Sequence, residues 1–318
     1  MECNCPHFTS TLFSHGYNQP EFLGKGSYSS VFKVHSLQYK KSFVVKVIKY
    51  KKCDEGMNDM KYMREVNALS CLNHPGIINF YDRFNDENLM FMVLEYCPNG
   101  TLAKQIKTGK TYNGPFFLKL ARDLTLAMSH CHHRSVFHRD IKPDNILIDK
   151  FNRPRLADFG LSHQGCQNDK NRVIGTLAFM PPELFGNSPI IDLAKADVWS
   201  LGVTLYNALT GSLPWFAGDD KAIEAQIKEC IISFPQESDK FCVDLVKAMM
   251  NPNPITRPTL LEILDLISSH EGKKIEASRL NYSKKVSMKN TLIFSKKRQL
   301  NDEVPFFKPD PCFSQTFM

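Results

Sequence analysis

Residues 138–145 read His138-Arg139-Asp140-Ile141-Lys142-Pro143-Asp144-Asn145. An acid, a cation and an amide therefore lie close together in the chain. Such a set offers a base or orienting group, a positive charge for a phosphate and an oxygen ligand for a metal ion. Further along, Asp158-Phe159-Gly160 supplies a second hard oxygen ligand at a flexible turn. Two oxygens of this kind suit Mg²⁺, which keeps waters and substrate phosphate as its other ligands.

A glycine-rich segment towards the N-terminus reads Leu23-Gly24-Lys25-Gly26-Ser27-Tyr28-Ser29-Ser30-Val31. Gly24 and Gly26 have no Cβ, so backbone N–H groups there can approach a phosphate closely. Two glycines in a turn are also common in an ordinary hairpin. This segment alone therefore does not separate a phosphate-binding loop from a plain turn.

One lysine lies inside an apolar strand pattern, Val44-Val45-Lys46-Val47. A lysine in such a strand is costly unless an opposite charge meets it. Glu65, on the helix predicted to follow, can be that partner. The alternative is a lysine on an edge strand whose ammonium reaches water along its aliphatic stem.

The order of predicted elements indicates two unequal lobes. Residues 43–48 and 89–94 are β-rich runs bounded by polar residues, which predicts strands. Residues 60–72 carry apolar side chains at helical spacing, and from Phe116 onward helices dominate. Pro and Gly within residues 95–100 interrupt any regular element between the two parts. The sequence therefore predicts a small β-rich lobe and a large helical lobe with a cleft between them.

Together, the glycine-rich loop, the strand lysine, the catalytic loop and the metal-binding turn follow the order and spacing of the protein-kinase signature. The sequence resembles eukaryotic protein kinases over residues 17–269. The resemblance continues at Pro181-Pro182-Glu183, where kinases carry Ala-Pro-Glu, and at Arg257, which matches the arginine that pairs with this Glu. Residues 197–202 resemble the central buried helix of the large lobe. The implied fold is the α+β, bilobal protein kinase fold.

The resemblance implies a role for each catalytic residue. Lys46 would hold the α- and β-phosphates of ATP and would be positioned by Glu65. Asp140 would accept a proton from the acceptor hydroxyl or orient it, and Lys142 would neutralise the γ-phosphoryl charge. Catalysis of this kind rests on positioning and charge neutralisation, because the transition state spreads charge over the equatorial phosphoryl oxygens.

The implied cofactors are ATP and Mg²⁺, with Asn145 and Asp158 as the metal ligands. Leu94 would be the gatekeeper behind the adenine, and backbone groups of Glu95 and Cys97 would bind its edge. The side chains expected to enclose the ring are Val31, Val44 and Leu147. The expected ATP-binding residues are Leu23, Gly24, Lys25, Gly26, Ser27, Tyr28, Ser29, Ser30, Val31, Val44, Lys46, Leu94, Glu95, Cys97 and Leu147.

Two positions depart from the family pattern. Ser29 stands where the third glycine of the loop is usual, which predicts a stiffer loop. Val44 replaces the usual alanine, which predicts a tighter adenine slot. Neither change removes a charge or a ligand.

Two features resemble kinases that phosphorylate serine or threonine of other proteins. Lys142 follows Asp140 by two positions, and Gly175-Thr176 precedes Pro182-Glu183 at the spacing where Thr contacts the catalytic Asp and Lys. Residues 155–162 and 253–259 resemble the calcium/calmodulin-dependent and AMP-activated kinase group. NIMA-related kinases are close in pattern.

Composition is that of a protein with a packed core, with 42% hydrophobic and 23% charged residues among 318. Apolar runs are too short to cross a bilayer, and the N-terminus lacks the pattern of a signal peptide. We expect the cytoplasm, with the nucleus as a second location, and ten reduced cysteines. Cys3, Cys5 and His7 have no second ligand pair at a zinc-like spacing, so we expect a mobile end there. The ligand-like residues 130–133 are consecutive on a helix and cannot converge on one ion.

Net charge is uneven along the chain. Of the formal +7, residues 270–318 carry +5, from ten Lys or Arg against five Asp or Glu, which leaves +2 for the body. Such a body has no general nucleic-acid-binding footprint. We therefore divide the chain into an N-terminal extension, a kinase domain and a basic tail expected to be disordered, namely 1–16, 17–269 (N-lobe about 17–95, C-lobe about 98–269) and 270–318.

The tail mixes cations with bulky apolar residues between 284 and 298. Such segments bind calmodulin, an acidic membrane or an import receptor. The alternative is a solvated end that binds nothing. We expect no other special partner beyond protein substrates with Ser or Thr acceptors.

Three other functions compete with catalysis on proteins. A pseudokinase scaffold predicts loss of Lys46, Asp140 or Asp158, and all three are present. A protein that acts mainly by binding partners through its tail would not need these three catalytic residues. A small-molecule kinase is disfavoured by Thr176 and residues 181–183, which build a platform for a peptide.

Activation is predicted not to require a phosphate on the activation loop. Between Asp158 and Glu183 the only Ser or Thr residues are Ser162 and Thr176. The first follows the metal-binding turn closely, and the second is committed to the acceptor platform. Arg172 stands where a phosphorylated residue is usual. The hypothesis is that Asp169 supplies a fixed negative charge to Arg139. The alternative is a loop that remains mobile until a partner or substrate orders it.

Overall fold

The computed structural model describes residues 6–26, 29–49, 57–86, 89–165, 168–169, 175–186, 191–216 and 218–273, with the backbone alone at 6–7, 57–61 and 168–169. The chain divides into two compact units, Met1–Asp265 and Leu266–Met318. Of the second unit the structure describes residues 266–273, which are helical. This helix begins at residue 260 and passes the predicted domain end at 269. Most of the predicted basic tail lies outside the described residues.

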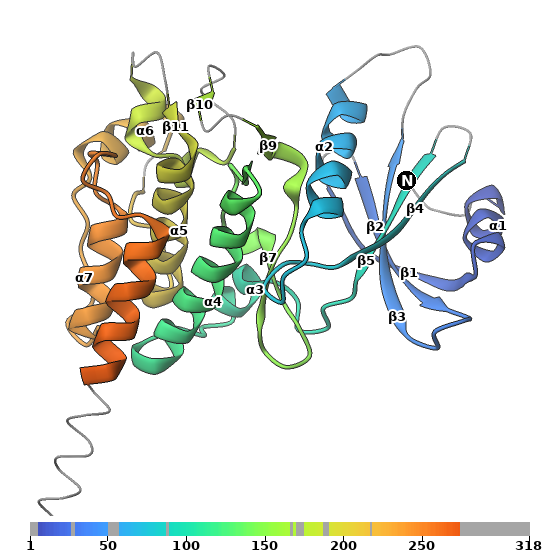
Figure 1. Cartoon of the computed structure of the whole chain (residues 1–318), viewed down its shortest axis with the longest axis horizontal. Coiled ribbons are helices and arrows are strands. Elements are labelled where there is room, and N and C mark those ends of the chain that lie inside the picture. The colour runs from blue at the N-terminus through green and yellow to red at the C-terminus, as the bar shows by residue number, and fades with distance from the viewer. Residues whose placement is uncertain are drawn as a thin grey trace, which may run out of the picture. The chain divides into compact units, whose positions relative to one another are not determined.

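A five-stranded antiparallel sheet forms the N-lobe (Figure 1). Its strand order is β1-β2-β3-β5-β4, and helix α2 (Met57–Cys71) connects β3 to β4. The strands predicted at 43–48 and 89–94 and the helix predicted at 60–72 are confirmed within a few residues. The strands are β1 (Tyr17–Lys25), β2 (Ser29–Ser36), β3 (Ser42–Lys49), β4 (Phe80–Asp86) and β5 (Leu89–Glu95).

The side chains of β3 alternate between an apolar face of the sheet and the face predicted to bind ATP. Phe43, Val45 and Val47 are buried in one apolar cluster. Because successive side chains of a strand point to opposite faces, Val44 and Lys46 lie on the other side, where both are half-buried. The alternation thus places the predicted ATP-binding residues of β3 on one face.

Helix α1 (Pro6–Ser14) covers the apolar face of the sheet. Figure 1 shows α1 and α2 on opposite sides of the sheet. Phe8 and Leu12, one helical turn apart, are buried in the cluster, and the ring centroid of Phe8 lies 4.9 Å from that of Phe32. The expectation of a mobile N-terminal end is therefore wrong from residue 6 onward, since His7 belongs to this helix. Cys3 and Cys5 lie outside the described residues.

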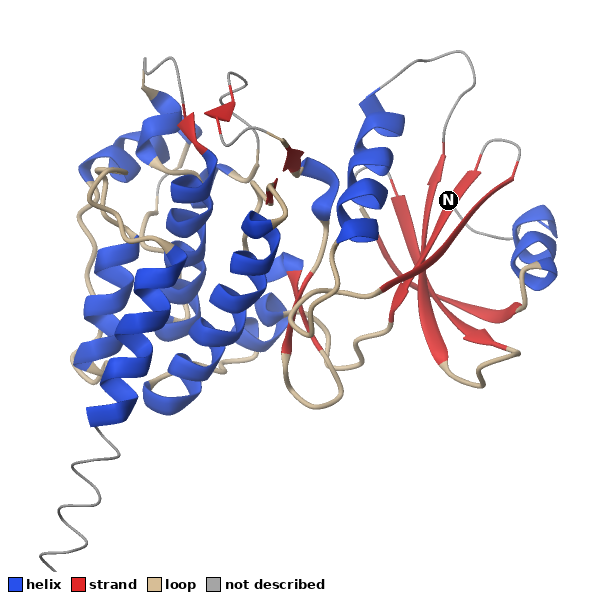
Figure 2. Ribbon diagram, viewed as in Figure 1, coloured by secondary structure: helices blue, strands red, loops and turns tan. Residues whose placement is uncertain are grey.

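Helices dominate the C-lobe, as predicted (Figure 2). The α-helices with both ends described are α3 (Leu102–Lys107), α4 (Gly114–His133), α5 (Leu193–Thr210), α6 (Asp220–Glu229) and α7 (Lys240–Met249). The short strands are β6 (Val136–Phe137), β7 (Ile146–Ile148), β8 (Pro154–Leu156), β9 (His163–Gln164), β10 (Asn168–Asp169) and β11 (Ile191–Asp192). The single 3₁₀ turns are η1 (Pro143–Asn145), η2 (Phe159–Leu161), η3 (Leu177–Phe179) and η4 (Pro182–Phe185). No helix among these residues is long and apolar enough to cross a membrane.

Helix α5 is buried along most of its length and anchors the C-lobe. Asp192 caps its first turn by accepting hydrogen bonds from the N–H groups of Ala194 and Lys195. The predicted pairing of Arg257 with Glu183 is confirmed, with N···O distances of 2.8 and 3.0 Å. This buried bidentate pair fixes the start of η4, and hence the end of the activation segment, against the C-lobe.

Candidate active site

The β3 lysine joins three elements of the fold. Lys46 Nζ lies 2.6 Å from Glu65 on α2 and 3.1 Å from Asp158, which precedes η2. The predicted Lys46–Glu65 pair is confirmed. Burial alone would lower the pKa of the Lys46 ammonium, but the two carboxylates raise it above its usual value. Lys46 is therefore a fixed cation at neutral pH.

Asp140 is surrounded by donors in the catalytic loop. Its carboxylate lies 2.8 Å from Lys142 Nζ and accepts hydrogen bonds from Asn145 Nδ2 at 3.0 Å and from the backbone N–H of Thr176 at 3.1 Å. The Thr176 hydroxyl lies 2.6 Å from Lys142 Nζ and donates to Asp140 at 2.9 Å. The predicted contact of Thr176 with both residues is thus confirmed. The activation segment and the catalytic loop meet at this point.

Asp197 of α5 holds the backbone of the catalytic loop. Its carboxylate accepts hydrogen bonds from the N–H groups of His138 and Arg139, at 2.9 and 2.8 Å, and lies 2.9 Å from His132 Nε2. Burial alone would raise the pKa of Asp197, but hydrogen bonding to His132 and its charge lower it below the usual value. An ionised acid in the core thus fixes the loop that carries Asp140.

The residues expected around the adenine lie on four strands. Val31 of β2, Val44 of β3 and Leu147 of β7 are half-buried, and Leu94 is buried at the end of β5. Burial of Cys97 raises the pKa of its thiol to about 12, so this thiol is not a nucleophile at neutral pH.

The glycine-rich loop joins β1 to β2. Gly26 N–H donates to Ser29 C=O at 2.8 Å, and a Cβ added to Gly26 would lie 2.9 Å from Ser29 Oγ. A side chain at position 26 would therefore require the Ser29 hydroxyl to move. Gly24 pairs with Val31 across the two strands. Ser27 and Tyr28 lie outside the described residues.

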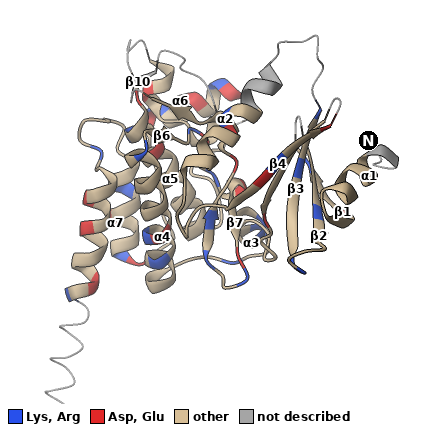
Figure 3. Ribbon diagram, turned by 45° about the vertical axis from the view of Figure 1, so that its right-hand side comes forward, with Lys and Arg blue, Asp and Glu red and all other residues tan. Residues whose placement is uncertain are grey.

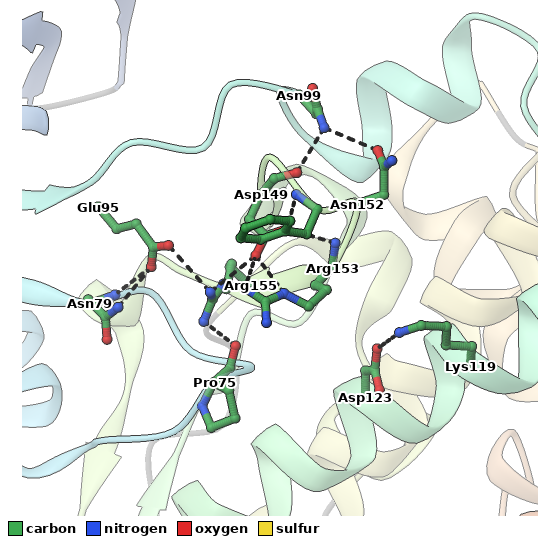
Figure 4. A network of polar contacts seen from close by, with 11 residues as sticks. Pro75, Asn79, Glu95, Asn99, Lys119, Asp123, Asp149, Asn152, Arg153 and Arg155 are labelled. Atoms are coloured by element: carbon green, nitrogen blue, oxygen red, sulfur yellow. Dashed lines mark hydrogen bonds and ion pairs between the residues drawn. The ribbon is translucent and has the colours of Figure 1, made fainter. Parts of the chain in front are cut away.

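A polar network ties residue Glu95 to the C-lobe (Figure 4). Glu95 Oε2 accepts from Asn79 Nδ2 at 3.1 Å, and Glu95 Oε1 lies 3.4 Å from Arg155 Nη2. The buried Arg155 guanidinium also donates to Asp149 at 3.1 Å and to the Pro75 carbonyl. One cation of β8 thus fixes the end of β5.

The model of the protein kinase domain matches residues 17–266. The chain belongs to the protein kinase family. Aurora/IPL1-related protein kinase 2 of Caenorhabditis elegans is 32% identical over 241 residues, which cover 76% of this chain and 78% of the relative. Aurora kinase B of Danio rerio is 29% identical over 244 residues, covering 76% and 75%. CBL-interacting serine/threonine-protein kinase 15 of Arabidopsis thaliana is 31% identical over 253 residues, covering 78% and 59%.

These relatives confirm the predicted class of enzyme. The chain is a serine/threonine protein kinase, which transfers a phosphoryl group from ATP to serine or threonine of proteins. CBL-interacting kinases agree with the predicted calcium/calmodulin-dependent and AMP-activated group, while the similarity to Aurora kinases is equally high. The family uses ATP and typically Mg²⁺.

The residues expected to bind Mg²⁺ fit a hard cation. Asn145 donates through Nδ2 to the backbone carbonyl and the carboxylate of Asp140, at 2.8 and 3.0 Å, which leaves its Oδ1 as an acceptor. Asp158 is half-exposed, and the Lys46 ammonium keeps its pKa below the usual value although burial opposes this. An amide oxygen and an ionised carboxylate form the kind of donor set that Mg²⁺ prefers.

Sequence reasoning missed several residues that position the kinase site. Asn79 and Arg155 were not singled out, and Asp197 was read only as part of a structural helix. The signal for Asp197 is an acid inside the otherwise apolar α5, which burial makes costly unless donors surround it.

Charged residues of both signs are interspersed over the ribbon in Figure 3.

Proposed function

We propose that Asp140, Lys142, Lys46 and Asp158 carry phosphoryl transfer in this kinase, with Mg²⁺ bound by Asn145 and Asp158. The observation that supports this proposal is that Lys46 meets Asp158, that Thr176 is bonded between Asp140 and Lys142, and that Lys142 interacts electrostatically with Asp158. When bound, Mg²⁺ would neutralise charge on the phosphates of ATP.

The residues of the chain would divide the work by position. Lys46 would hold the α- and β-phosphates, and Glu65 keeps its ammonium in place at 2.6 Å. Asp140 would orient the acceptor hydroxyl and take its proton, while Lys142, at 2.8 Å from Asp140, would face the transferred group. Val31, Val44 and Leu147 would enclose the adenine, and the backbone of Glu95 and Cys97 would bind its edge.

Substitution of the charged residues tests this assignment. Asp140→Asn and Asp158→Asn should each lower kcat by about a hundredfold or more, because each removes positioning or metal charge from the transition state. Lys46→Met should also lower kcat severely. The matched control is Asp144→Asn, an exposed carboxylate of the same loop, which should retain activity. Wild-type turnover in any of the three folded variants would overturn the assignment.

The acceptor class and a scaffold function can be tested with the same protein. Phosphoamino acid analysis of a labelled generic substrate should give phosphoserine and phosphothreonine, because Thr176 is fixed beside Asp140. Phosphotyrosine as the main product would overturn the proposed role of Thr176. If purified protein neither hydrolyses nor transfers the γ-phosphoryl group of ATP, the assigned roles are wrong and a scaffold explains the fold.

The regulatory role proposed for the basic segment stays a prediction, since residues 274–318 lie outside the described residues. We propose a location in the cytoplasm, with the nucleus as a second one. A chain ending at Ser269 should differ from the full chain in activity, in calmodulin capture or in distribution within the cell. If none of the three changes, the segment is a solvated end.

A further inference from the structure

Three aromatic rings gather at one end of the N-lobe sheet, away from the catalytic residues. Tyr39 lies in the turn between β2 and β3, Phe43 lies in β3, and Tyr81 lies in β4. The Phe43 ring meets Tyr81 at 5.0 Å and 87°, and Tyr39 at 6.2 Å and 63°. Phe43 is only 2% exposed, whereas Tyr39 and Tyr81 are 62% and 47% exposed. The three rings thus form a floor and two walls that are open to solvent.

The backbone fixes the two tyrosine walls. In the β4–β5 ladder Phe80 is opposite Leu94 and Asp82 is opposite Val93, so Tyr81 is the extra residue of a bulge. A bulge turns a side chain out of the regular alternation of a strand. The turn that carries Tyr39 is closed by the Ser36 N–H, which donates to Lys41 C=O at 3.0 Å.

The Lys41 ammonium lies within this group of rings. Its Nζ is 4.7 Å from the Phe43 centroid, 4.8 Å from Tyr81 and 6.0 Å from Tyr39. No carboxylate among the described residues lies in ion-pair range of Lys41, whereas Lys33 on β2 pairs with Glu21 at 2.9 Å. The aromatic faces are therefore what attracts the Lys41 cation.

We propose that Tyr39, Phe43 and Tyr81 form a binding site for a methylated ammonium, with Lys41 as its internal occupant. A lysine ammonium is a compact and strongly hydrated charge with three N–H donors, which ring faces satisfy poorly. A trimethylammonium keeps the charge, has no N–H donor and presents methyl groups to the rings. Aromatic cages recognise such ions for this reason. The shared chemistry fits a trimethyllysine side chain or a choline headgroup.

The site can be tested without disturbing catalysis. Phe43 is opposite Glu95 in the β3–β5 ladder, but Lys41, Tyr39 and Tyr81 belong to none of the catalytic or ATP-binding residues. Lys41→Gln removes the internal cation and leaves the rings in place. Kinase activity and the melting temperature of this variant should match those of the wild type, which shows that the lobe is folded.

The experiment is an NMR titration of the full chain with tetramethylammonium, a trimethyllysine peptide and phosphocholine. Lys41→Gln should bind at least one probe about tenfold more tightly than the wild type, since the competing ammonium is gone. Adding Tyr81→Leu to Lys41→Gln should abolish that gain. Adding Tyr39→Leu to Lys41→Gln should abolish it as well, because each change removes one of the two exposed rings. Which probe binds identifies the source of the ammonium, and an unmethylated lysine peptide should bind weakly.

Lys33→Gln is the matched control, because Lys33 lies over a single ring, that of Tyr96, at 5.3 Å. This variant should show no gain in affinity for any probe. If Lys41→Gln binds none of the probes more tightly than Lys33→Gln does, the three rings serve only to hold the turn and the proposal is wrong.

Discussion

At the scale of single residues, Arg155 contacts three separate parts of the chain. Its buried guanidinium meets Glu95 and Asp149 and donates to the Pro75 carbonyl. Each partner comes from a different part of the chain, namely the end of β5, the segment after β7 and the loop after α2. Removal of this cation would leave carboxylates in a poorly solvated place.

Arg155→Met should therefore lower the free energy of unfolding by about 3 kcal/mol, because a buried ion pair loses one partner. The same substitution should raise KM for ATP more than it changes kcat, since it loosens the segment expected to bind the adenine edge. Urea unfolding and steady-state kinetics measure the two effects.

Arg153→Met is the matched control for Arg155. Arg153 binds the same Asp149 carboxylate, with Nη2 at 2.8 Å, but its side chain is well exposed. Its loss should cost less than about 1 kcal/mol. Equal free energies of unfolding for the two variants would refute the special role of Arg155.

The difference between predicted and unpredicted site residues has a physical origin. Lys46, Asp140 and Asp158 lie in short motifs whose chemistry is readable at once, because base, cation and metal ligand are neighbours in the chain. Asn79 and Arg155 bracket Glu95 only after the lobes are folded. Neither has a local pattern that separates it from an ordinary polar residue.

At the scale of elements, α1 is an integral part of the N-lobe. Leu12 is 0% exposed within the apolar cluster, whereas its neighbour Phe13 is 63% exposed. Leu12→Ala should lower the free energy of unfolding by about 3 kcal/mol, because it leaves a cavity between helix and sheet. Thermal and urea unfolding of the full chain measure the change.

Phe13→Ala provides the control on the same helix. It removes a larger side chain but empties no packed space, so it should change the free energy of unfolding by less than about 0.5 kcal/mol. If Leu12→Ala is as mild as Phe13→Ala, α1 does not contribute to the stability of the sheet.

The backbone of the activation segment pairs with the residues at the start of α5. Asn168 pairs with Asp192 and Asp169 with Ile191, so β10 joins β11 at the start of α5. Together with the Thr176 contacts, this pairing supports activity without a phosphate on the segment. Protein treated exhaustively with phosphatase should keep most of its activity, and Asp169→Asn should lose part of it.

Mass spectrometry decides the outcome for the activation segment. A phosphate between residues 161 and 180, whose removal abolishes activity, would contradict the hypothesis. The proposed Asp169–Arg139 contact stays a prediction, because the side chain of Asp169 and all of Arg172 lie outside the described residues.

The helices and strands of regular periodicity were predictable, and the two-residue strands were not. A run such as 43–48 predicts a strand because it is rich in β-branched residues. By contrast, β10 and β11 contain no such pattern and exist through pairing across the fold. Helix α1 was not predicted, because its two residues in the apolar cluster, Phe8 and Leu12, span a single helical turn, which is too short for a recognisable periodicity.

At the scale of the whole molecule, stability should depend on pH through two facing histidines. The rings of His74 and His130 stack at 5.3 Å, and the buried Nε2 of His130 has no hydrogen-bond partner among the described residues. Burial is the main cause that lowers the pKa of both imidazoles, and positive neighbours add to it. The unfolded chain therefore binds more protons than the native state below about pH 6.5.

Because of this difference in proton binding, the contribution of the two histidines to the free energy of unfolding is complete above about pH 6.5. It is lost as the pH falls towards their pKa values in the native state. His130→Leu should make the decline in unfolding free energy between about pH 7.5 and 5.5 shallower. His133→Leu, on the exposed side of the same helix end, should flatten the slope less, because it removes only one of the smaller causes that lower the pKa of His130. Equal slopes for His130→Leu and the wild type would contradict the assignment.

The position of α1 has a consequence for synthesis of the chain. The helix is synthesised before the sheet, and the apolar cluster against which it packs includes Phe91 and Val93, which are synthesised much later. At about 5–20 residues per second, the nascent Phe8 and Leu12 wait roughly four to sixteen seconds for a complete docking surface. During that time the apolar face of the helix is uncovered, and a chaperone can shield it. The apolar side of α1 therefore stays open to aggregation during synthesis until the strands that bury it have formed.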